Sequence, residues 1–120
     1  MTIKKVASGI VSTALFCWIS VIGNISVANA DAIADGKKVA FDRKKGNCLA
    51  CHMMGDGTLP GNIGPPLVAM KARFPDKAKL RAQIWDPTVA NPNTIMPPFG
   101  KHGVLTEKEV DLVTEFVYTL

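Results

Sequence analysis

Hydrophobic residues near the end of the chain recur every three to four positions, the spacing of one face of an α-helix. Thr106 and Glu109 precede this stripe at the spacing of a capping box, in which each side chain accepts the other residue's backbone N–H. The pattern predicts a final helix that begins after Thr106. Its apolar face comprises Val110, Val113, Val117 and Leu120.

Apolar and small residues at helical spacing also predict a first helix over about residues 32–44, with Asp31 as its N-cap. Gly36 lies on the apolar face of this helix. It lowers helix stability there, but it would let a second helix cross closely. We expect Gly46 to end the helix.

Two shorter helices are predicted between these elements. The second helix would start at Pro66, a residue suited to a first helical turn, and would place Leu67, Met70 and Phe74 on one face. The third would run over about residues 76–85 and end before Pro87. No stretch alternates for long with a period of two, so the predicted fold class is all-α.

Residues 87–105 show no helical pattern. This stretch contains Pro87, Pro92, Pro97 and Pro98. An ordered loop of this length is unusual in a small domain and needs a surface to lie against. A bound cofactor would supply that surface.

The first 30 residues follow a different pattern. Lys4 and Lys5 precede an apolar run over residues 6–22, and a small-residue site follows at residues 27–30. This is the order of an export signal. We therefore predict that residues 1–30 are cleaved and that residues 31–120 form one exported, periplasmic domain. The alternative is a retained membrane anchor, for which the apolar run is shorter than the roughly 20 residues of a spanning helix.

Charge and size restrict the function further. The 120 residues carry 14 Lys+Arg and 10 Asp+Glu, a net charge of +4 that falls when Lys4 and Lys5 are removed. This balance gives no electrostatic footprint for nucleic acid. A domain of this size has a marginal core and often requires a metal, a cofactor or a partner.

The chemistry is indicated by Cys48, Cys51 and His52, which form the C-x-x-C-H sequence of covalent c-type haem attachment. The two thiols would add to the haem vinyl groups, and His52 would then become an axial ligand of the iron. The predicted cofactor is one covalent haem c. Less favoured alternatives are a zinc site completed by His102, a redox thiol pair and a structural disulfide.

The second axial ligand has several candidates, namely Met53, Met54, Met70, Met96 and His102. Met96 is favoured because Pro97 and Pro98 fix the course of the chain beside it. Met53 and Met54 are tethered next to His52 and cannot easily reach the other face of the haem. Met70 suits core packing, and His102 suits an exposed loop.

Two residues are candidates for outer contacts of the haem site. The carbonyl oxygen of Pro65 would suit the Nδ1–H of His52, fixing the ring and raising its basicity, although Pro65 also suits a helix start. The indole of Trp85 could reach a haem propionate, and core packing is an equal alternative.

A His/Met iron has no vacancy for substrate, so these ligands point to electron transfer. Two basic stretches, residues 43–45 and 71–81, could steer a partner toward the haem. They could equally be solvated faces.

The order of these features resembles that of class I cytochromes c over the whole of residues 31–120. The stretches GNCLACH (46–52), LPGNIGPPL (59–67) and NPNTIMPPFG (91–100), with RAQIWD (81–86) and EFVY (115–118), look like SoxX, the monohaem subunit of SoxAX complexes. The resemblance implies a small fold of three to four helices around one covalent haem, with a long proline-rich ligand loop. It also implies Cys48 and Cys51 as thioether attachments and His52 and Met96 as axial ligands.

SoxAX complexes are periplasmic L-cysteine S-thiosulfotransferases that join thiosulfate to a cysteine of the carrier SoxYZ. The resemblance implies that a SoxA-type subunit carries the catalytic haem, and that this chain accepts its electrons and passes them to a soluble cytochrome c. The chain would not be catalytic alone and would not contact a membrane after cleavage. Two alternatives are a free electron carrier serving an oxidase or reductase, and a small haem enzyme or gas binder with a labile sixth ligand.

Overall fold

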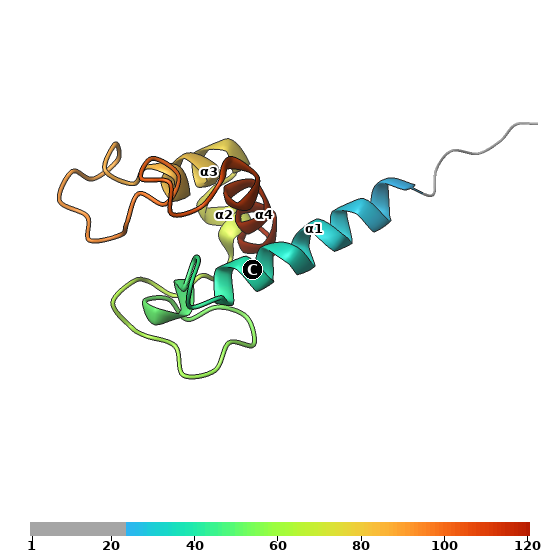
Figure 1. Cartoon of the computed structure of the whole chain (residues 1–120), viewed down its shortest axis with the longest axis horizontal. Coiled ribbons are helices and arrows are strands. Elements are labelled where there is room, and N and C mark those ends of the chain that lie inside the picture. The colour runs from blue at the N-terminus through green and yellow to red at the C-terminus, as the bar shows by residue number, and fades with distance from the viewer. Residues whose placement is uncertain (1–23) are drawn as a thin grey trace, which may run out of the picture.

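The computed structural model describes residues 24–120, which fold into four α-helices and one 3₁₀ turn (Figure 1). They are, in chain order, α1 (Asn24–Phe41), η1 (Cys48–Ala50), α2 (Met70–Arg73), α3 (Lys77–Trp85) and α4 (Glu107–Val117). Over the same residues, β pairing consists of an isolated parallel bridge between Met54 and Leu67. The predicted all-α class is confirmed.

Helix α4 begins as its sequence predicts. The Thr106 hydroxyl accepts the backbone N–H of Glu109 at 3.2 Å, and a Glu109 carboxylate oxygen accepts the backbone N–H of Thr106 at 3.0 Å. The Glu109 carboxylate also pairs with the Lys45 ammonium. This ion pair ties the start of α4 to the segment before η1.

Helix α1 differs from its prediction at both ends. It begins at Asn24 rather than residue 32, and Asp31 lies inside it rather than capping it. The alanines of residues 27–30 favour helix and continue the element. The helix ends at Phe41, and Gly46 lies beyond it in a turn, where its N–H donates to Val39 O at 3.2 Å. The apolar run at residues 6–22 is outside the described residues.

Helices α1 and α4 pack against each other (Figure 1), and they cross at Gly36, as the small residue predicted. A Cβ placed on Gly36 would lie 1.9 Å from the carbonyl oxygen of Leu112. Beside this crossing, the rings of Phe41 and Phe116 meet edge to face with centroids 5.8 Å apart. The first and last helices therefore pack backbone to backbone.

The prediction for the second helix was wrong at its start. Helix α2 has only one turn, and Leu67 lies before it, donating its N–H to Met53 O at 2.8 Å. Ala69 adopts a left-handed conformation with φ +52°, which separates residues 65–68 from the helix. The third helix is confirmed, because Asp76 caps α3 by accepting the N–H of Ala78 at 2.9 Å and the helix ends at Trp85.

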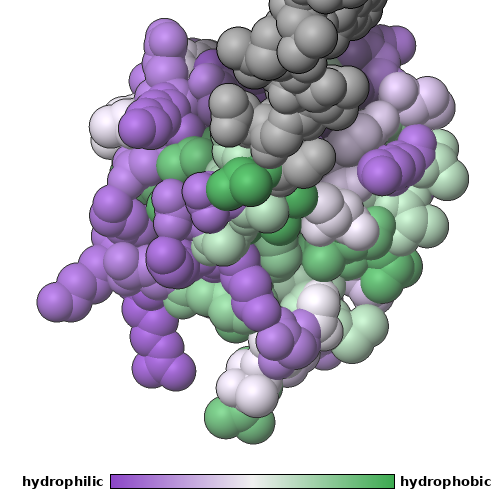
Figure 2. Space-filling model, turned by 90° about the vertical axis from the view of Figure 1, so that its right-hand side faces the viewer, coloured by the Kyte–Doolittle hydropathy of each residue, from purple (hydrophilic) through white to green (hydrophobic). Residues whose placement is uncertain are grey.

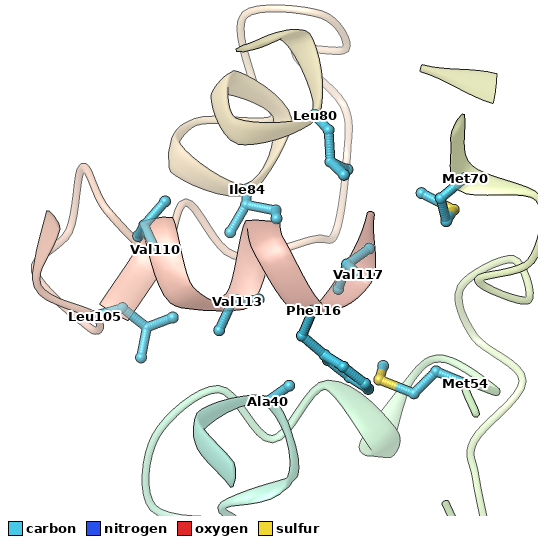
Figure 3. Close-up of a cluster of buried hydrophobic side chains, with 10 residues drawn as sticks. All are labelled: Ala40, Met54, Met70, Leu80, Ile84, Leu105, Val110, Val113, Phe116 and Val117. Atoms are coloured by element: carbon cyan, nitrogen blue, oxygen red, sulfur yellow. The ribbon is translucent and has the colours of Figure 1, made fainter. Parts of the chain in front are cut away.

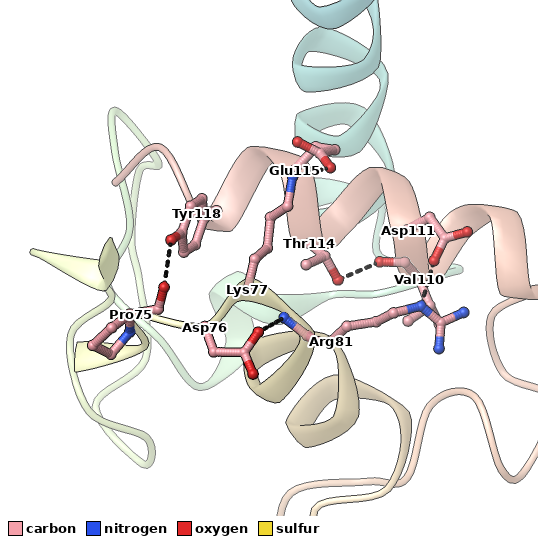
Figure 4. Close-up of polar contacts among 10 residues, drawn as sticks. Pro75, Asp76, Lys77, Arg81, Val110, Asp111, Thr114, Glu115 and Tyr118 are labelled. Carbon is pink, nitrogen blue, oxygen red and sulfur yellow. Dashed lines mark hydrogen bonds and ion pairs between the residues drawn. The ribbon is translucent and has the colours of Figure 1, made fainter. Parts of the chain in front are cut away.

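The hydrophobic core lies where α1, α3 and α4 meet (Figure 3). Leu80 and Ile84 of α3 face α4 on one side, and Ala40 of α1 faces it on the other. Ion pairs join α3 and α4 at the surface: Lys77 with Glu115 at 2.6 Å and Arg81 with Asp111 at 2.5 Å (Figure 4). The three helices thus form the frame from which the loops extend.

Two long loops leave this frame at the end of the molecule opposite the N-terminal half of α1 (Figure 1). One follows η1, and the other connects α3 to α4 over residues 86–106. The predicted long proline-rich loop is therefore confirmed.

On the face from which α1 leaves the body, hydrophilic residues gather along one side and hydrophobic residues lie beside them (Figure 2).

Candidate haem site

A cavity of about 580 Å³ lies between the two loops and the helical frame. Its volume is in the range of cofactor pockets, which are mostly apolar with a few polar groups. Cys48, Cys51 and His52 line it from the first loop, and Met96 lines it from the second. Leu80, Ile84, Val113 and Val117 of the core form its floor. The structure therefore brings together the four residues for which the sequence predicted direct bonds to haem.

The turn at η1 places the two cysteines and the histidine on one wall. Asn47, just before it, adopts a left-handed conformation with φ +47°. The carbonyl oxygen of Cys48 then accepts the N–H groups of Cys51 at 3.2 Å and His52 at 2.9 Å. Both thiols are free and half-buried, and burial raises the pKa of the Cys48 thiol to about 11. At neutral pH the wall accordingly presents a protonated Cys48 thiol to an apolar space.

The imidazole of His52 is held in place at its Nδ1 atom. Its Nδ1 lies 2.7 Å from the carbonyl oxygen of Pro65, the partner that the sequence suggested. Gly64 lies against the ring, and a Cβ there would come within 2.3 Å of it. The chain folds back here because the Gly64 N–H donates to Cys51 O at 2.8 Å. These residues fit an axial histidine whose other nitrogen is left for iron.

Met96 is half-buried and reaches the cavity from the loop that follows α3. Its backbone N–H donates to the Thr94 hydroxyl at 3.1 Å, which fixes the turn before it. Pro97, directly after it, also lines the cavity. The local course of the chain at Met96 is thus set on both sides.

The other candidate ligands occupy different places. Met54 and Met70 are 1% exposed and belong to the core, although Met70 also contributes to the cavity wall. Met53 is 48% exposed and His102 is exposed, and neither lines the cavity. Within residues 24–120 no group of three or more His, Cys, Asp or Glu side chains is arranged to hold a metal ion. The zinc alternative loses its support.

Trp85 is not among the residues that line the cavity. Its indole packs flat on Gly100, where a Cβ would lie 2.0 Å from the ring, and the Arg81 guanidinium lies 5.5 Å from the ring centroid. Of the two alternatives for Trp85, the structure favours packing.

Sequence reasoning missed Arg73 as a cavity residue. Its guanidinium lines the cavity, donates to the Pro66 carbonyl at 2.8 Å and lies 3.4 Å from the Met70 sulfur. Its spacing of three from Met70 was the available signal, because residues i and i+3 share a helix face. In the sequence, Arg73 was grouped with the other basic residues of 71–81, so this spacing was overlooked.

A helical frame with two loops around an apolar cavity, and a C-x-x-C-H turn in its wall, defines a small cytochrome c. The sequence comparisons agree, and the chain belongs to the family described as cytochrome c oxidase, cbb3-type, subunit III, which it matches over residues 31–117. Membership of this family implies haem c as the cofactor and electron transfer as the general function.

Two individual proteins are similar to this chain. An uncharacterized lipoprotein of Aquifex aeolicus (strain VF5) is 36% identical over 77 residues, which cover 62% of this chain and 37% of that protein. This chain therefore spans little more than a third of that relative. The crystal structure of SoxXA from P. pantotrophus matches with a TM-score of 0.65 and 27% identity, covering 72% of this chain and 79% of that one. This match confirms the resemblance to SoxX-like cytochromes c.

None of the helices in the described part of the chain has the length and apolar character needed to cross a membrane.

Proposed function

We propose that this chain is the exported monohaem electron-transfer subunit of a SoxAX-type L-cysteine S-thiosulfotransferase. The proposal depends above all on one observation, the cavity that Cys48, Cys51, His52 and Met96 line together. The SoxXA match over most of the chain supports the type of complex. The lipoprotein name of the Aquifex relative supports export, and a family match that begins at residue 31 agrees with cleavage after Ala30.

The residues of the cavity would hold one haem through two kinds of bond. Cys48 and Cys51 would hold it covalently, and His52 and Met96 would be its axial ligands. When bound, haem c supplies a one-electron iron couple, whose potential a thioether ligand raises. Pro65 orients His52 and, by accepting the Nδ1–H, increases the basicity of its other nitrogen. With haem bound, the apolar floor would keep water from the iron.

Arg73 would pair with a haem propionate. Its guanidinium lines the cavity. None of the ion pairs found among residues 24–120 includes it. A cation left without a carboxylate partner beside an apolar cavity is suited to an acidic group of the cofactor.

The partner surface would surround the mouth of the cavity. Ile63 and Ile95 line the cavity from the two loops and yet are 63% and 77% exposed. Exposed apolar residues at one opening indicate a contact site. Arg43 and Lys44, also in the cavity lining, add positive charge that would steer an acidic surface toward it. We propose that a SoxA-type cytochrome subunit covers this mouth, and that a soluble cytochrome c takes the electron onward.

The test is isolation of the exported protein from its host, without disrupting its complexes. We expect a haem-stained chain that co-purifies with a larger cytochrome subunit and is reduced when thiosulfate and the SoxYZ carrier are added. In Met96→Ala, the thioether-to-iron charge-transfer absorption of the ferric protein should disappear, whereas Met70→Leu should retain it. Recovery of only a monomer, not reduced under these conditions, would contradict the proposal.

A second candidate is a free electron carrier that serves an oxidase, and the oxidase named in the family description is the observation behind it. This candidate predicts a monomer that an oxidase oxidises rapidly. A haem enzyme or gas binder would instead require a labile sixth ligand, and rapid binding of carbon monoxide by the reduced protein would indicate it.

A further inference from the structure

The loop that contains Met96 is closed at its base by a polar contact between its two ends. Asp86 follows α3 directly, and its side chain is only 10% exposed. One carboxylate oxygen accepts the Lys101 ammonium at 2.7 Å, and the other accepts the N–H of Thr88 at 3.1 Å together with its hydroxyl. The carboxylate thus joins the entry of the loop to its exit.

The backbone repeats this closure one residue earlier. The carbonyl oxygen of Trp85 accepts the N–H groups of both Gly100 and Lys101 at 3.2 Å. Gly100 is buried under the indole, where any Cβ would collide with the ring. The last residues of the loop are therefore fixed in position against the end of α3.

The distance along the chain from this closure to Met96 is short and stiff. Pro97 and Pro98 have fixed φ angles, and the His102 N–H donates to the Pro98 carbonyl at 2.9 Å. A displacement of Lys101 would consequently be transmitted to Met96 rather than absorbed between them. Asp86 itself is not among the residues that line the cavity.

We propose that the Asp86–Lys101 pair is a clamp that positions the Met96 sulfur, with Asp86 as a positioning residue. The proposal rests on the proposed function, in which Met96 is the axial ligand. When the ion pair is broken, the loop is free to move further from the end of α3. Less free energy is then needed to withdraw the Met96 sulfur from the iron. The clamp would thereby set how easily an external base replaces Met96.

Imidazole is a suitable probe, because it can displace an axial thioether in the ferric holoprotein. In Asp86→Asn the dissociation constant of imidazole should fall about tenfold, the effect of losing one partly buried charged hydrogen bond. Lys101→Met should act in the same direction, and Lys101→Arg should restore the wild-type value. Hydrogen exchange at the amides of Gly100 and Lys101 should accelerate in the two open variants.

Glu115→Gln is the matched control, because it removes the ion pair with Lys77 at the other end of α3. An equal change in this control, or unchanged imidazole affinity in Lys101→Met, would overturn the clamp even if Asp86→Asn failed to fold. Persistence of the thioether absorption in Met96→Ala would instead overturn the ligand assignment. The two failures are therefore distinguishable.

Discussion

The Nδ1 atom of His52 lies 2.7 Å from the carbonyl oxygen of Pro65, thirteen residues further along the chain. This contact exists because Gly64 permits the backbone to pass directly over the imidazole ring. Ring orientation and ring basicity are therefore both set by one turn of the first loop.

Gly64→Ala should disturb this relationship. The new Cβ would lie within 2.3 Å of the ring, so the ring or the turn must shift and the hydrogen bond to Pro65 is weakened. A less basic axial histidine stabilises ferric iron less, so the reduction potential should rise by about 40 mV, equivalent to one hydrogen bond of about 1 kcal/mol. A redox titration measures this shift.

Gly103→Ala is the control for that substitution. Gly103 has a positive φ of +67°, but a Cβ there meets nothing within 4 Å. It should lower stability through backbone strain and leave the potential unchanged. If both variants moved the potential equally, the specific role of Gly64 would be refuted.

Gly36→Ala should destabilise the fold although alanine is the better helix former. Its Cβ would overlap the Leu112 carbonyl at 1.9 Å, so α1 and α4 must separate. We expect a loss of about 1–3 kcal/mol in the free energy of unfolding, typical of overpacking, measured by denaturant titration. Ala34→Ser, on the exposed face of α1, should change it by no more than about 0.5 kcal/mol. An increase in the stability of Gly36→Ala would contradict the close crossing.

Acid should weaken the start of α4. The hydrogen bond from Lys45, supported by the Thr106 backbone N–H, lowers the pKa of Glu109 from its ordinary 4.5 to about 2. Because the folded-state pKa is the lower one, the stabilisation is complete above about pH 4.5 and is lost as the pH falls toward 2. Urea midpoints measured across this range should fall less steeply in Glu109→Gln than in wild type.

Glu107→Gln is the matched variant for this pH series. Glu107 lies in the same first turn of α4, but its side chain is not part of the capping box. Its midpoints should therefore follow the wild-type dependence on pH. Identical pH profiles for Glu109→Gln and the wild type would show that the capping carboxylate does not contribute.

Ile95→Asp should weaken binding of the proposed SoxA-type partner. Ile95 lines the cavity mouth, and a carboxylate there would have to be desolvated in the interface. We expect at least a tenfold increase in the dissociation constant, measured by calorimetry with the isolated partner. Val89→Asp is the control, because Val89 is 82% exposed in the same loop but does not line the cavity. Equal effects of the two substitutions would place the contact elsewhere.

Much of this fold was predictable where local rules suffice. The capping box of Thr106 and Glu109 and the Asp76 cap join residues two or three positions apart in the sequence. Gly36 indicated a close helix crossing, but not its partner Leu112. The start of α2 was not predictable in the same way. Leu67 has helical spacing to Met70, but it donates to Met53 in the first loop, and the left-handed Ala69 interrupts the pattern.

In the candidate site, too, some features follow from local sequence and others depend on the tertiary fold. Cys48, Cys51 and His52 are adjacent in sequence, so their grouping followed from the motif alone. Met96 was inferred from its prolines, and the structure places it at the same cavity. Arg73 and the Asp86–Lys101 pair were missed, because their contacts depend on how the two loops fold back and no spacing rule encodes them.

The crossing of α1 and α4 at Gly36 has a consequence for the order of assembly. A chain that emerges from its N-terminus presents Cys48, Cys51 and His52 well before Glu107–Val117 is available to cover α1. The attachment sequence would therefore be accessible before the last helix closes the domain. Val113 and Val117 of that helix line the cavity, so its closure would complete the wall around a group already attached.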